Sequence, residues 1–183
     1  MRRSAVAPTG QERTFAAEDI IVSKTDLQGR LTYANEVFLD VSKYRRSELI
    51  GQPHSIVRHP DMPRGLFHLL WETISAGDEV FAYIDNLAAD GANYWVLAHV
   101  TPTFDRTGRV IGYHSNRRLP ERGPIDRIRE VYARMRAVES RYTNSREAAA
   151  ASAAMVRDEL AEAGQSYERF VWQLISGRDV TCV

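Results

Sequence analysis

Short runs of alternating apolar and polar residues, separated by turn sequences, occupy the chain from about residue 19 to residue 120. The apolar run at residues 20–22 and the run at residues 30–34 flank the turn material of residues 25–29, which predicts a β-hairpin. Further along, two Gly-containing turns separate three more runs of this kind. These runs predict a three-stranded meander over residues 80–86, 93–102 and 109–117.

The segment between the hairpin and the meander has helical patterns instead. Asn35 can cap a helix over residues 36–42, because its side-chain oxygen can accept from the free amides of the first turn. Residues 53–63 are dense in proline and histidine, so they cannot form one regular helix. The next helix is predicted to begin near Pro63 and to stop at Gly77. Its apolar residues lie at helical spacing: Leu66, Phe67, Leu70, Trp71 and Ile74.

From residue 124 onward the pattern is helical for most of the remaining length. Narrow apolar stripes recur at three- and four-residue spacing, with an Ala-rich stretch between them. We expect two amphipathic helices over residues 124–176, after a break at residues 123 and 124. The chain therefore divides into an N-terminal cap or flexible segment (1–18), a central α+β domain (19–120) and a C-terminal helical segment (124–183).

The two faces of the predicted meander differ in side-chain size. Because successive side chains of a strand point to opposite faces, the small residues Ala82 and Ala98 share the inner face, towards the short helices. They leave room either for nearby aromatic side chains or for a bound planar ligand. The outer face carries the large side chains of Phe81, Tyr83, Trp95 and Leu97. Such a face needs a cover, which can be the N-terminal segment, the C-terminal helices or a second copy of the protein.

The composition narrows the possible functions. The chain has 183 residues, 44% of them hydrophobic, and its 24 basic residues balance 24 acidic ones. A zero net charge argues against sequence-independent nucleic-acid binding, and no apolar run approaches the ~20 residues that cross a bilayer. The single cysteine, Cys182, excludes an internal disulfide and a thiolate metal cluster. We expect a cytoplasmic protein that is not an enzyme, since no hydrolase, phosphate-loop or kinase motif is present.

The most specific signal is the run Pro-His-x-x-Val-Arg-His-Pro-Asp-Met-Pro over residues 53–63. It is followed by Phe67, Trp71 and Gly77, then by Tyr94-Trp95-Val96 and Gly112-Tyr113. Over about residues 19–118, this pattern resembles the PAS sensor domain of aerotaxis (energy-taxis) receptors. The resemblance implies a PAS fold, which is a five-stranded antiparallel sheet with short helices on one face, followed here by C-terminal helices.

That family binds FAD non-covalently and reports its redox state, so the resemblance implies FAD as the cofactor. The chain departs from the membrane-bound receptor at residues 80–83, where the receptor has a Trp-x-Gly element, and at Leu87, where an arginine is usual. The sequence also holds no transmembrane span and no methyl-accepting region. It therefore resembles the soluble PAS half of bipartite energy-taxis systems, which implies a membrane-bound chemoreceptor as partner.

The resemblance makes Arg58, His59 and Asp61 the first candidates for cofactor binding. The guanidinium and imidazole groups can donate to the pyrophosphate or ring carbonyls of FAD, and the carboxylate can accept from ribose or ring N–H groups. The alternative is an ion pair between Arg58 and Asp61 that stiffens the loop. His54 is a further candidate, with a loop-capping role as its alternative.

Three more candidates lie outside the proline-rich run. Trp71 resembles the family tryptophan near the flavin, and Asn86 resembles the asparagine directed at the ring edge; the alternatives are a core tryptophan and a turn residue. His114 lies two residues after Gly112, a position that points at the flavin in related light sensors. It can instead be a haem ligand or an ordinary histidine. Covalent haem is excluded, because no Cys-x-x-Cys-His run exists.

Three functional hypotheses follow. The first is a cytoplasmic FAD-binding redox sensor, a homodimer that signals to a chemoreceptor-type partner by protein contact. Reduction turns flavin N5 from an acceptor into a donor, so Asn86 or His114 would have to reorient. The second hypothesis is a haem-binding PAS gas or redox sensor. The third is a cofactor-free PAS module that dimerises through its outer face and C-terminal helices.

Overall fold

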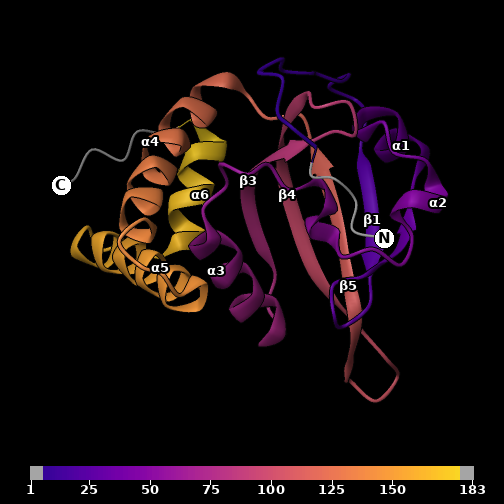
Figure 1. Ribbon diagram of the computed structural model, residues 1–183. Coiled ribbons are helices and arrows are strands. Elements are labelled where there is room, and N and C mark those ends of the chain that lie inside the picture. Colours follow the sequence, from indigo (N-terminus) through magenta and orange to yellow (C-terminus); the bar gives the residue numbers. More distant parts are fainter. Residues whose placement is uncertain (1–5, 178–183) are drawn as a thin grey trace.

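The computed structural model describes residues 6–177, and a five-stranded antiparallel sheet forms its centre (Figure 1). The predicted hairpin consists of β1 (Ile21–Thr25) and β2 (Leu31–Ala34). The predicted meander consists of β3 (Val80–Leu87), β4 (Asn93–Phe104) and β5 (Val110–Arg118). The strand order is β2-β1-β5-β4-β3, so β5, the last strand within residues 6–177, lies between β1 and β4. The α+β arrangement expected from the sequence is confirmed.

Short helices lie on the inner face of this sheet. They are α1 (Glu36–Ser42), α2 (Arg46–Leu49), the 3₁₀ turn η1 (His54–Val57) and α3 (Arg64–Ser75). Asn35 caps α1 as predicted: its Oδ1 accepts from the amide of Phe38 (3.1 Å). The same oxygen accepts from the amide of Val22 on β1 (2.9 Å), so one side chain fixes α1 to the sheet. The proline-rich segment contains no regular helix beyond η1, also as predicted.

The register of the strands decides which side chains reach the inner face. Ala82 pairs with Ala98, and Ala98 pairs in turn with Arg117 of β5. Because directly opposed residues of neighbouring strands share a face, Arg117 projects to the inner side beside two alanines. Both alanines are fully buried, and Arg117 is only 3% exposed. The small side chains therefore leave space next to a buried cation.

Helices α4 (Arg122–Glu139) and α6 (Tyr167–Ser176) cover the outer face of β3 and β4 (Figure 1). The ring of Tyr132 stacks on that of Trp95 with centroids 6.5 Å apart, and the Tyr132 hydroxyl donates to the carbonyl of Tyr83 (2.6 Å). Trp172 of α6 packs on Phe81, with the ring centroids 4.9 Å apart. The C-terminal helices, one of the three covers considered from the sequence, therefore cover the outer face of the sheet.

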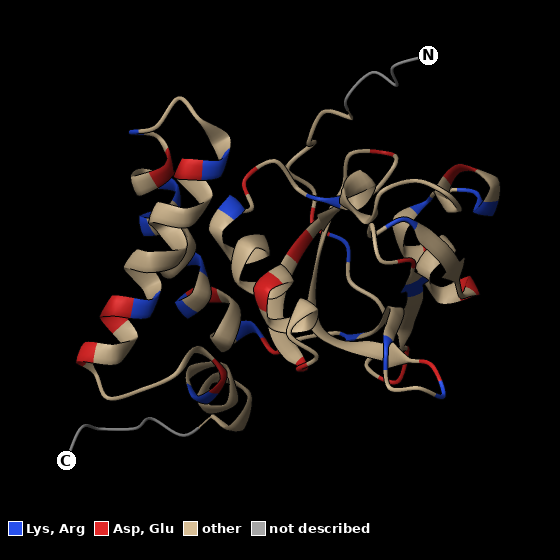
Figure 2. Ribbon diagram, turned by 90° about the horizontal axis from the view of Figure 1, so that it is seen from below, with Lys and Arg blue, Asp and Glu red and all other residues tan. Residues whose placement is uncertain are grey.

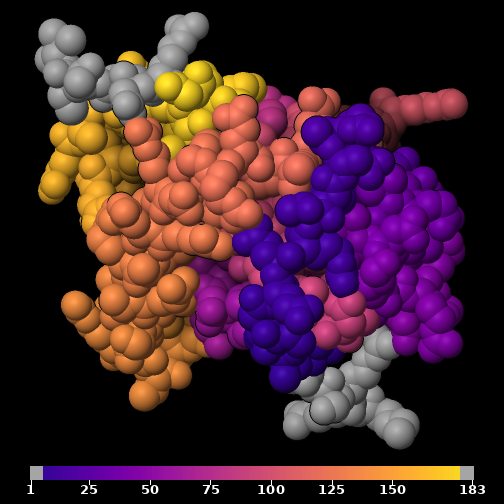
Figure 3. Space-filling model, turned by 90° about the horizontal axis from the view of Figure 1, so that it is seen from above, coloured from indigo at the N-terminus to yellow at the C-terminus, as the bar shows by residue number. Residues whose placement is uncertain are grey.

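A strap formed by residues 9–13 adds to this cover at the start of β4, between α4 and the short helices (Figure 3). The amide of Arg13 donates to the carbonyl of Asn93 (2.7 Å), and Glu12 pairs with Arg122 of α4 at 2.7 Å. This N-terminal strap therefore joins the sheet to α4.

Three helices follow the sheet in the described chain, where the sequence predicted two. Helix α5 (Ser145–Glu162) ends near Gly164, whose φ of +64° turns the chain. Ser166 then caps α6 by accepting from the amide of Arg169 (3.2 Å). The predicted break at residues 123 and 124 is also wrong, because both lie in the first turn of α4. Proline fits there, since no intrahelical hydrogen bond needs its missing amide hydrogen.

Two general expectations can be compared with the described residues. Over residues 6–177, no helix combines the length and apolar character that crossing a bilayer requires. Basic and acidic residues are interspersed along the elements seen in Figure 2, in keeping with the neutral net charge. Cys182 lies outside the described residues.

Candidate functional site

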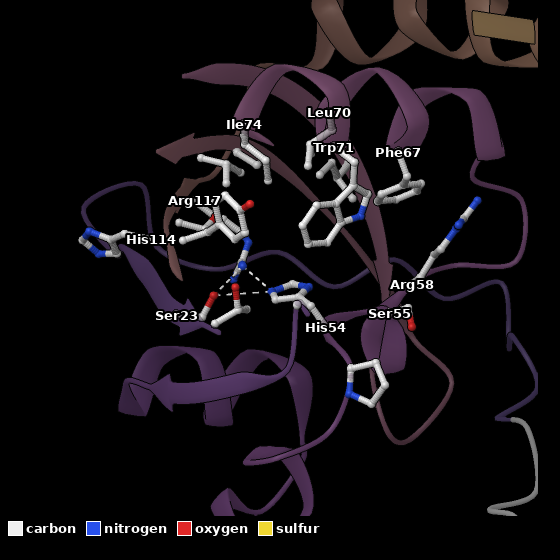
Figure 4. Close-up of a pocket in the computed structure, with 18 of the residues that line it drawn as sticks. Ser23, His54, Ser55, Arg58, Phe67, Leu70, Trp71, Ile74, His114 and Arg117 are labelled. Carbon is white, nitrogen blue, oxygen red and sulfur yellow. Dashed lines mark hydrogen bonds between the residues drawn. The ribbon is translucent and has the colours of Figure 1, made fainter. Parts of the chain in front are cut away.

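A cavity of about 270 Å³ lies between α3, η1 and the inner face of the sheet (Figure 4). Helix α3 lines it with apolar side chains at the predicted helical spacing: Phe67, Leu70, Trp71 and Ile74. The sheet lines it with Ile84, Ala98 and Val100 from β3 and β4. The room predicted beside the small inner-face residues is therefore present, because Phe67 and Trp71 form walls and leave the space between them open.

A polar cluster from three elements closes one end of the cavity (Figure 4). Arg117 of β5 donates through Nη2 to the hydroxyl of Ser23 on β1 (2.7 Å) and to Nε2 of His54 in η1. A guanidinium has no acceptor, so Nε2 of His54 must accept and the ring proton must reside on Nδ1. Burial and the charge of Arg117 hold the pKa of His54 well below its ordinary value. The imidazole is therefore neutral.

Arg117 is a buried cation whose hydrogen-bond partners are neutral. Burial lowers its pKa to about 10, so the guanidinium remains charged at neutral pH. The ring of Phe38 lies 5.1 Å from the guanidinium carbon, and no carboxylate within residues 6–177 forms an ion pair with Arg117. The hydroxyl of Ser115, which also lines the cavity, is buried without a hydrogen-bond partner. The site thus offers a positive charge and an unused polar group to a ligand.

Arg58 and Asn86 meet at the edge of the cavity. Their backbones form an isolated antiparallel bridge, which ties the proline-rich loop to β3. The Arg58 guanidinium lies 4.0 Å over the ring of Phe67 and donates to the carbonyl of Met62 (2.9 Å). Burial lowers the pKa of Arg58 to about 10. Both residues line the cavity, and Arg58 forms no ion pair with Asp61.

His59 and Asp61 do not line the cavity, although the sequence grouped them with Arg58. His59 is buried with its amide directed at the carbonyl of Asp85 (3.4 Å), and its Nδ1 accepts from the amide of Asp61 (3.2 Å). The side chain of Asp61 is exposed, 3.9 Å from the same nitrogen. In an extended backbone neighbouring side chains diverge, so the bridge that places Arg58 at the cavity turns His59 away from it.

His114 is among the residues that line the cavity, as predicted, but its imidazole ring lies on the opposite side of the sheet from the one expected. It pairs with Lys24 of β1 and Thr101 of β4, and its side chain points away from the cavity (Figure 4). Its neighbours Tyr113 and Ser115 point inward instead. Counting two residues from Gly112 therefore selects the wrong face. The residues that sequence reasoning missed are Ser23, Tyr113, Ser115 and Arg117. Alternation along β5 puts the last three on one face of that strand, but only the register with β4 shows that this face is the inner one.

Trp71 stands at the mouth of the cavity, as a wall and not as a core side chain. The residue is 38% exposed, and its indole meets the ring of Tyr113 edge-on, with the ring centroids 5.4 Å apart. Gly29, in the β1–β2 turn with φ +74°, allows this position, because a Cβ there would approach the indole to 2.9 Å. The turn and the helix therefore fit together only around a residue without a side chain.

We expect Gly29→Ala to destabilise the protein more than Gly108→Ala does. Both glycines have positive φ, which costs about 1–2 kcal/mol for a residue with a side chain. Only Gly29 adds a steric contact with Trp71, since a Cβ on Gly108 would meet nothing within 4 Å. Urea unfolding of both variants, followed by tryptophan fluorescence, separates the two effects. Equal losses of stability would show that Trp71 does not depend on Gly29.

Comparison with known proteins shows to which family this architecture belongs. Residues 12–115 match the family model described as the PAS fold. The chain belongs to the PAS family. Among solved structures, this PAS protein is similar in fold to the dark structure of the blue-light photoreceptor Aureochrome1 LOV, with a TM-score of 0.52 at 20% identity. That match covers 56% of this chain and 77% of the other.

Two curated relatives indicate which kind of PAS domain is present. The chain is 37% identical to the aerotaxis receptor of Escherichia coli K12 over 129 residues, which are 70% of this chain and 25% of the receptor. It is 29% identical over 92 residues to the biofilm dispersion protein BdlA of Pseudomonas aeruginosa, covering 47% of this chain and 21% of that protein. The resemblance to aerotaxis-type PAS domains is confirmed. The chain spans about a quarter or less of the length of these relatives.

Proposed function

We propose that this PAS protein is an FAD-binding redox sensor of the aerotaxis type. The observation that carries the proposal is the buried guanidinium of Arg117, which faces a cavity with only neutral partners. Burying a cation without a counter-charge is costly. A ligand with electron-rich oxygen and nitrogen atoms offsets that cost. The similarity to the aerotaxis receptor supports a flavin as this ligand.

The residues present fit the flat ring system of a flavin. Phe67, Leu70 and Ile74 supply apolar contact surface, while Ser115 and Asn86 supply polar groups for the ring edge. The cavity, about 270 Å³, is at the lower end of the range of ligand pockets, roughly 300–1,000 Å³. It therefore suits the ring better than the whole dinucleotide.

Arg58, at the edge of the cavity, is the residue that would hold the pyrophosphate. Its guanidinium is fixed over Phe67 and keeps donors in addition to the one used by the Met62 carbonyl. Planar guanidinium groups bind phosphate oxygens in pairs, which makes Arg58 suited to this role.

Bound FAD supplies reversible electron uptake, with a change in the donor and acceptor pattern of its ring. Arg117 favours the more negative form of the ligand, because its guanidinium stays charged at neutral pH. Asn86 can present either its carbonyl or its amide N–H groups. Leaving a buried polar group unpaired costs about 1–3 kcal/mol, which is enough to reorient such a side chain.

The proposal also covers how the redox state of the bound cofactor is signalled to another protein. We infer that the sensor acts in the cytoplasm by contact with a chemoreceptor-type or other signalling partner, as a homodimer and without a catalytic step of its own. The similarity to the aerotaxis receptor supports a signalling role.

The arrangement of the histidines favours FAD over haem. A haem ligand needs a free imidazole nitrogen directed into the cavity. His54 uses Nε2 to accept from Arg117, and the imidazole of His114, although this residue lines the cavity, points away from it. A flavin makes no demand on either nitrogen.

The deciding experiment is the absorption spectrum of the purified full chain, followed by chromatography of whatever denaturation releases. We expect a flavin spectrum and FAD in the supernatant, either as purified or after incubation with FAD. A Soret band would favour the haem hypothesis. Colourless protein that takes up no FAD would contradict the proposal and favour the cofactor-free module.

A further inference from the structure

Helix α3 has two faces with different neighbours, and only one of them is the cavity. Phe67, Leu70, Trp71 and Ile74 line the cavity. The opposite side of α3 packs along α5, far away in the sequence (Figure 1). The helix that forms one wall of the cavity is thus also the surface on which the C-terminal helices dock.

The contact between α3 and α5 is a close approach of two backbones. A Cβ on Gly65 would lie 2.1 Å from the hydroxyl oxygen of Ser152 and 2.9 Å from the carbonyl of Ala149. It would also lie 2.8 Å from the amide nitrogen of Ala153. The facing residues of α5 are small and recur at three- and four-residue spacing, so they form a flat surface against which only glycine fits. The sequence of both helices therefore specifies this packing.

Glu139, at the end of α4, fastens the two helices together. Its Oε1 accepts from the amide of Gly65 (2.9 Å) and from the hydroxyl of Ser152 (2.7 Å). The amide of Gly65 lies in the first turn of α3, where no intrahelical acceptor exists. One carboxylate thus joins α3, α4 and α5.

Two further contacts flank this joint and extend it along α3. Arg136 of α4 donates to the carbonyl of Asp61 (2.8 Å), just before α3 begins. Arg157 of α5 pairs with Glu72, one residue after Trp71. The contacts therefore run from the proline-rich loop to the part of α3 that stands at the cavity mouth.

From this arrangement we propose that α5 is the output element of the sensor, coupled to the pocket through α3 by the Gly65–Glu139–Ser152 joint. Close-packed helices have no free space in which to absorb a displacement, so a shift of α3 is passed to α5. The inference rests on the proposed function, because it takes FAD as the group that occupies the cavity.

The test is hydrogen exchange of the full chain, measured by mass spectrometry with and without bound FAD. We expect the exchange rates of α5 amides to differ by about 5- to 150-fold between the two states, the usual range of coupling between sites. The change should disappear in Glu139→Ala, which removes the acceptor from Gly65 and Ser152. The matched control is Glu130→Ala, on an exposed position of the same helix, which should keep the change.

A second variant guards against loss of folding in Glu139→Ala. Ser152→Ala keeps the bond from Gly65 to Glu139 and removes one of its two partners, so it should reduce the FAD-dependent change without abolishing it. Coupling between two sites is reciprocal, so weakening the joint should also change the Kd for FAD.

The possible failures can be told apart. FAD-loaded protein in which α5 exchanges as it does without FAD would overturn this inference and leave the proposed function intact. An FAD-dependent change that survives in Glu139→Ala would overturn the role of the joint. Protein that takes up no FAD would overturn the proposed function, and the inference with it.

Discussion

Replacing Arg117 with methionine is expected to weaken FAD binding by roughly tenfold to 150-fold, the equivalent of one lost hydrogen bond to a charged group. The same change is expected to stabilise the protein without FAD by about 1–4 kcal/mol, because an apolar side chain replaces a buried cation that lacks a counter-charge. The hydroxyl oxygen of Ser23 and Nε2 of His54 lose Arg117 as their donor. These two atoms lie 3.4 Å apart, so they can form a hydrogen bond with each other. Opposite signs for binding and stability distinguish a binding residue from a structural one.

The two quantities can be measured on one preparation, by titration of FAD and by urea unfolding of the protein without FAD. Arg118→Met is the matched control, since Arg118 is the exposed next residue on the other face of β5. It should leave both quantities nearly unchanged. If Arg117→Met bound FAD as tightly as the parent, the central observation of the proposal would have no functional meaning.

Asp85 leads to the second large effect, on stability and its dependence on pH. This carboxylate lies on the outer face of β3, where Asn93 Nδ2 donates to both oxygens (3.0 and 3.3 Å). His59, Arg129 of α4 and Glu12 of the N-terminal strap also face it. Burial outweighs the favourable neighbours and raises the pKa of Asp85 from 3.8 to about 6. At neutral pH the carboxylate is therefore ionised where the structure favours its neutral form.

The sign of the pH effect follows from this shift. The folded chain binds the proton more tightly than the unfolded chain, so Asp85 stabilises the fold most below about pH 4 and this contribution is lost as the pH rises through about 6. Asp85→Asn should raise the free energy of unfolding at pH 7 by up to about 3 kcal/mol, at about 1.4 kcal/mol per pKa unit. An asparagine at this position can still accept from Asn93.

Urea unfolding at several pH values checks this expectation. When the pH is lowered from 7 to 5, the free energy of unfolding of the parent should rise by about 1 kcal/mol relative to that of Asp85→Asn. Asp158→Asn, which changes an exposed carboxylate on α5, should follow the parent at every pH. Parallel curves for the parent and Asp85→Asn would show that the carboxylate is not shifted as described.

Most elements of the fold could be predicted from the sequence, because local signals decide them. Alternation and turn residues located all five strands, and Asn35 predicted the start of α1. The division of the C-terminal segment was harder. The end of α5 depends on Gly164 and Ser166, which interrupt a helical pattern only weakly, and the first turn of α4 accommodates the proline that suggested a break.

The site was harder to predict from the sequence than the fold, because strand pairings between distant parts of the chain decide which residues line it. The inner face of β3 and β4 could be predicted from alternation, and His54, Arg58, Trp71 and Asn86 do line the cavity. Its buried cation could not, since Arg117 reaches the cavity only through the register of β5 between β1 and β4. The positions of His59 and Asp61 depend on the bridge between the proline-rich loop and β3, which no local pattern reveals.

The packing of α4 and α6 on the sheet bears on how the domain can be divided. The part that matches the PAS family model ends at residue 115, before either helix begins. Cut there, the chain would leave Trp95, Tyr83 and Phe81 facing water, at roughly 1.5–3 kcal/mol for each large side chain. Such a fragment would expose an apolar surface and be prone to self-association. The smallest part of this chain that folds by itself is therefore longer than the segment that matches the PAS family model.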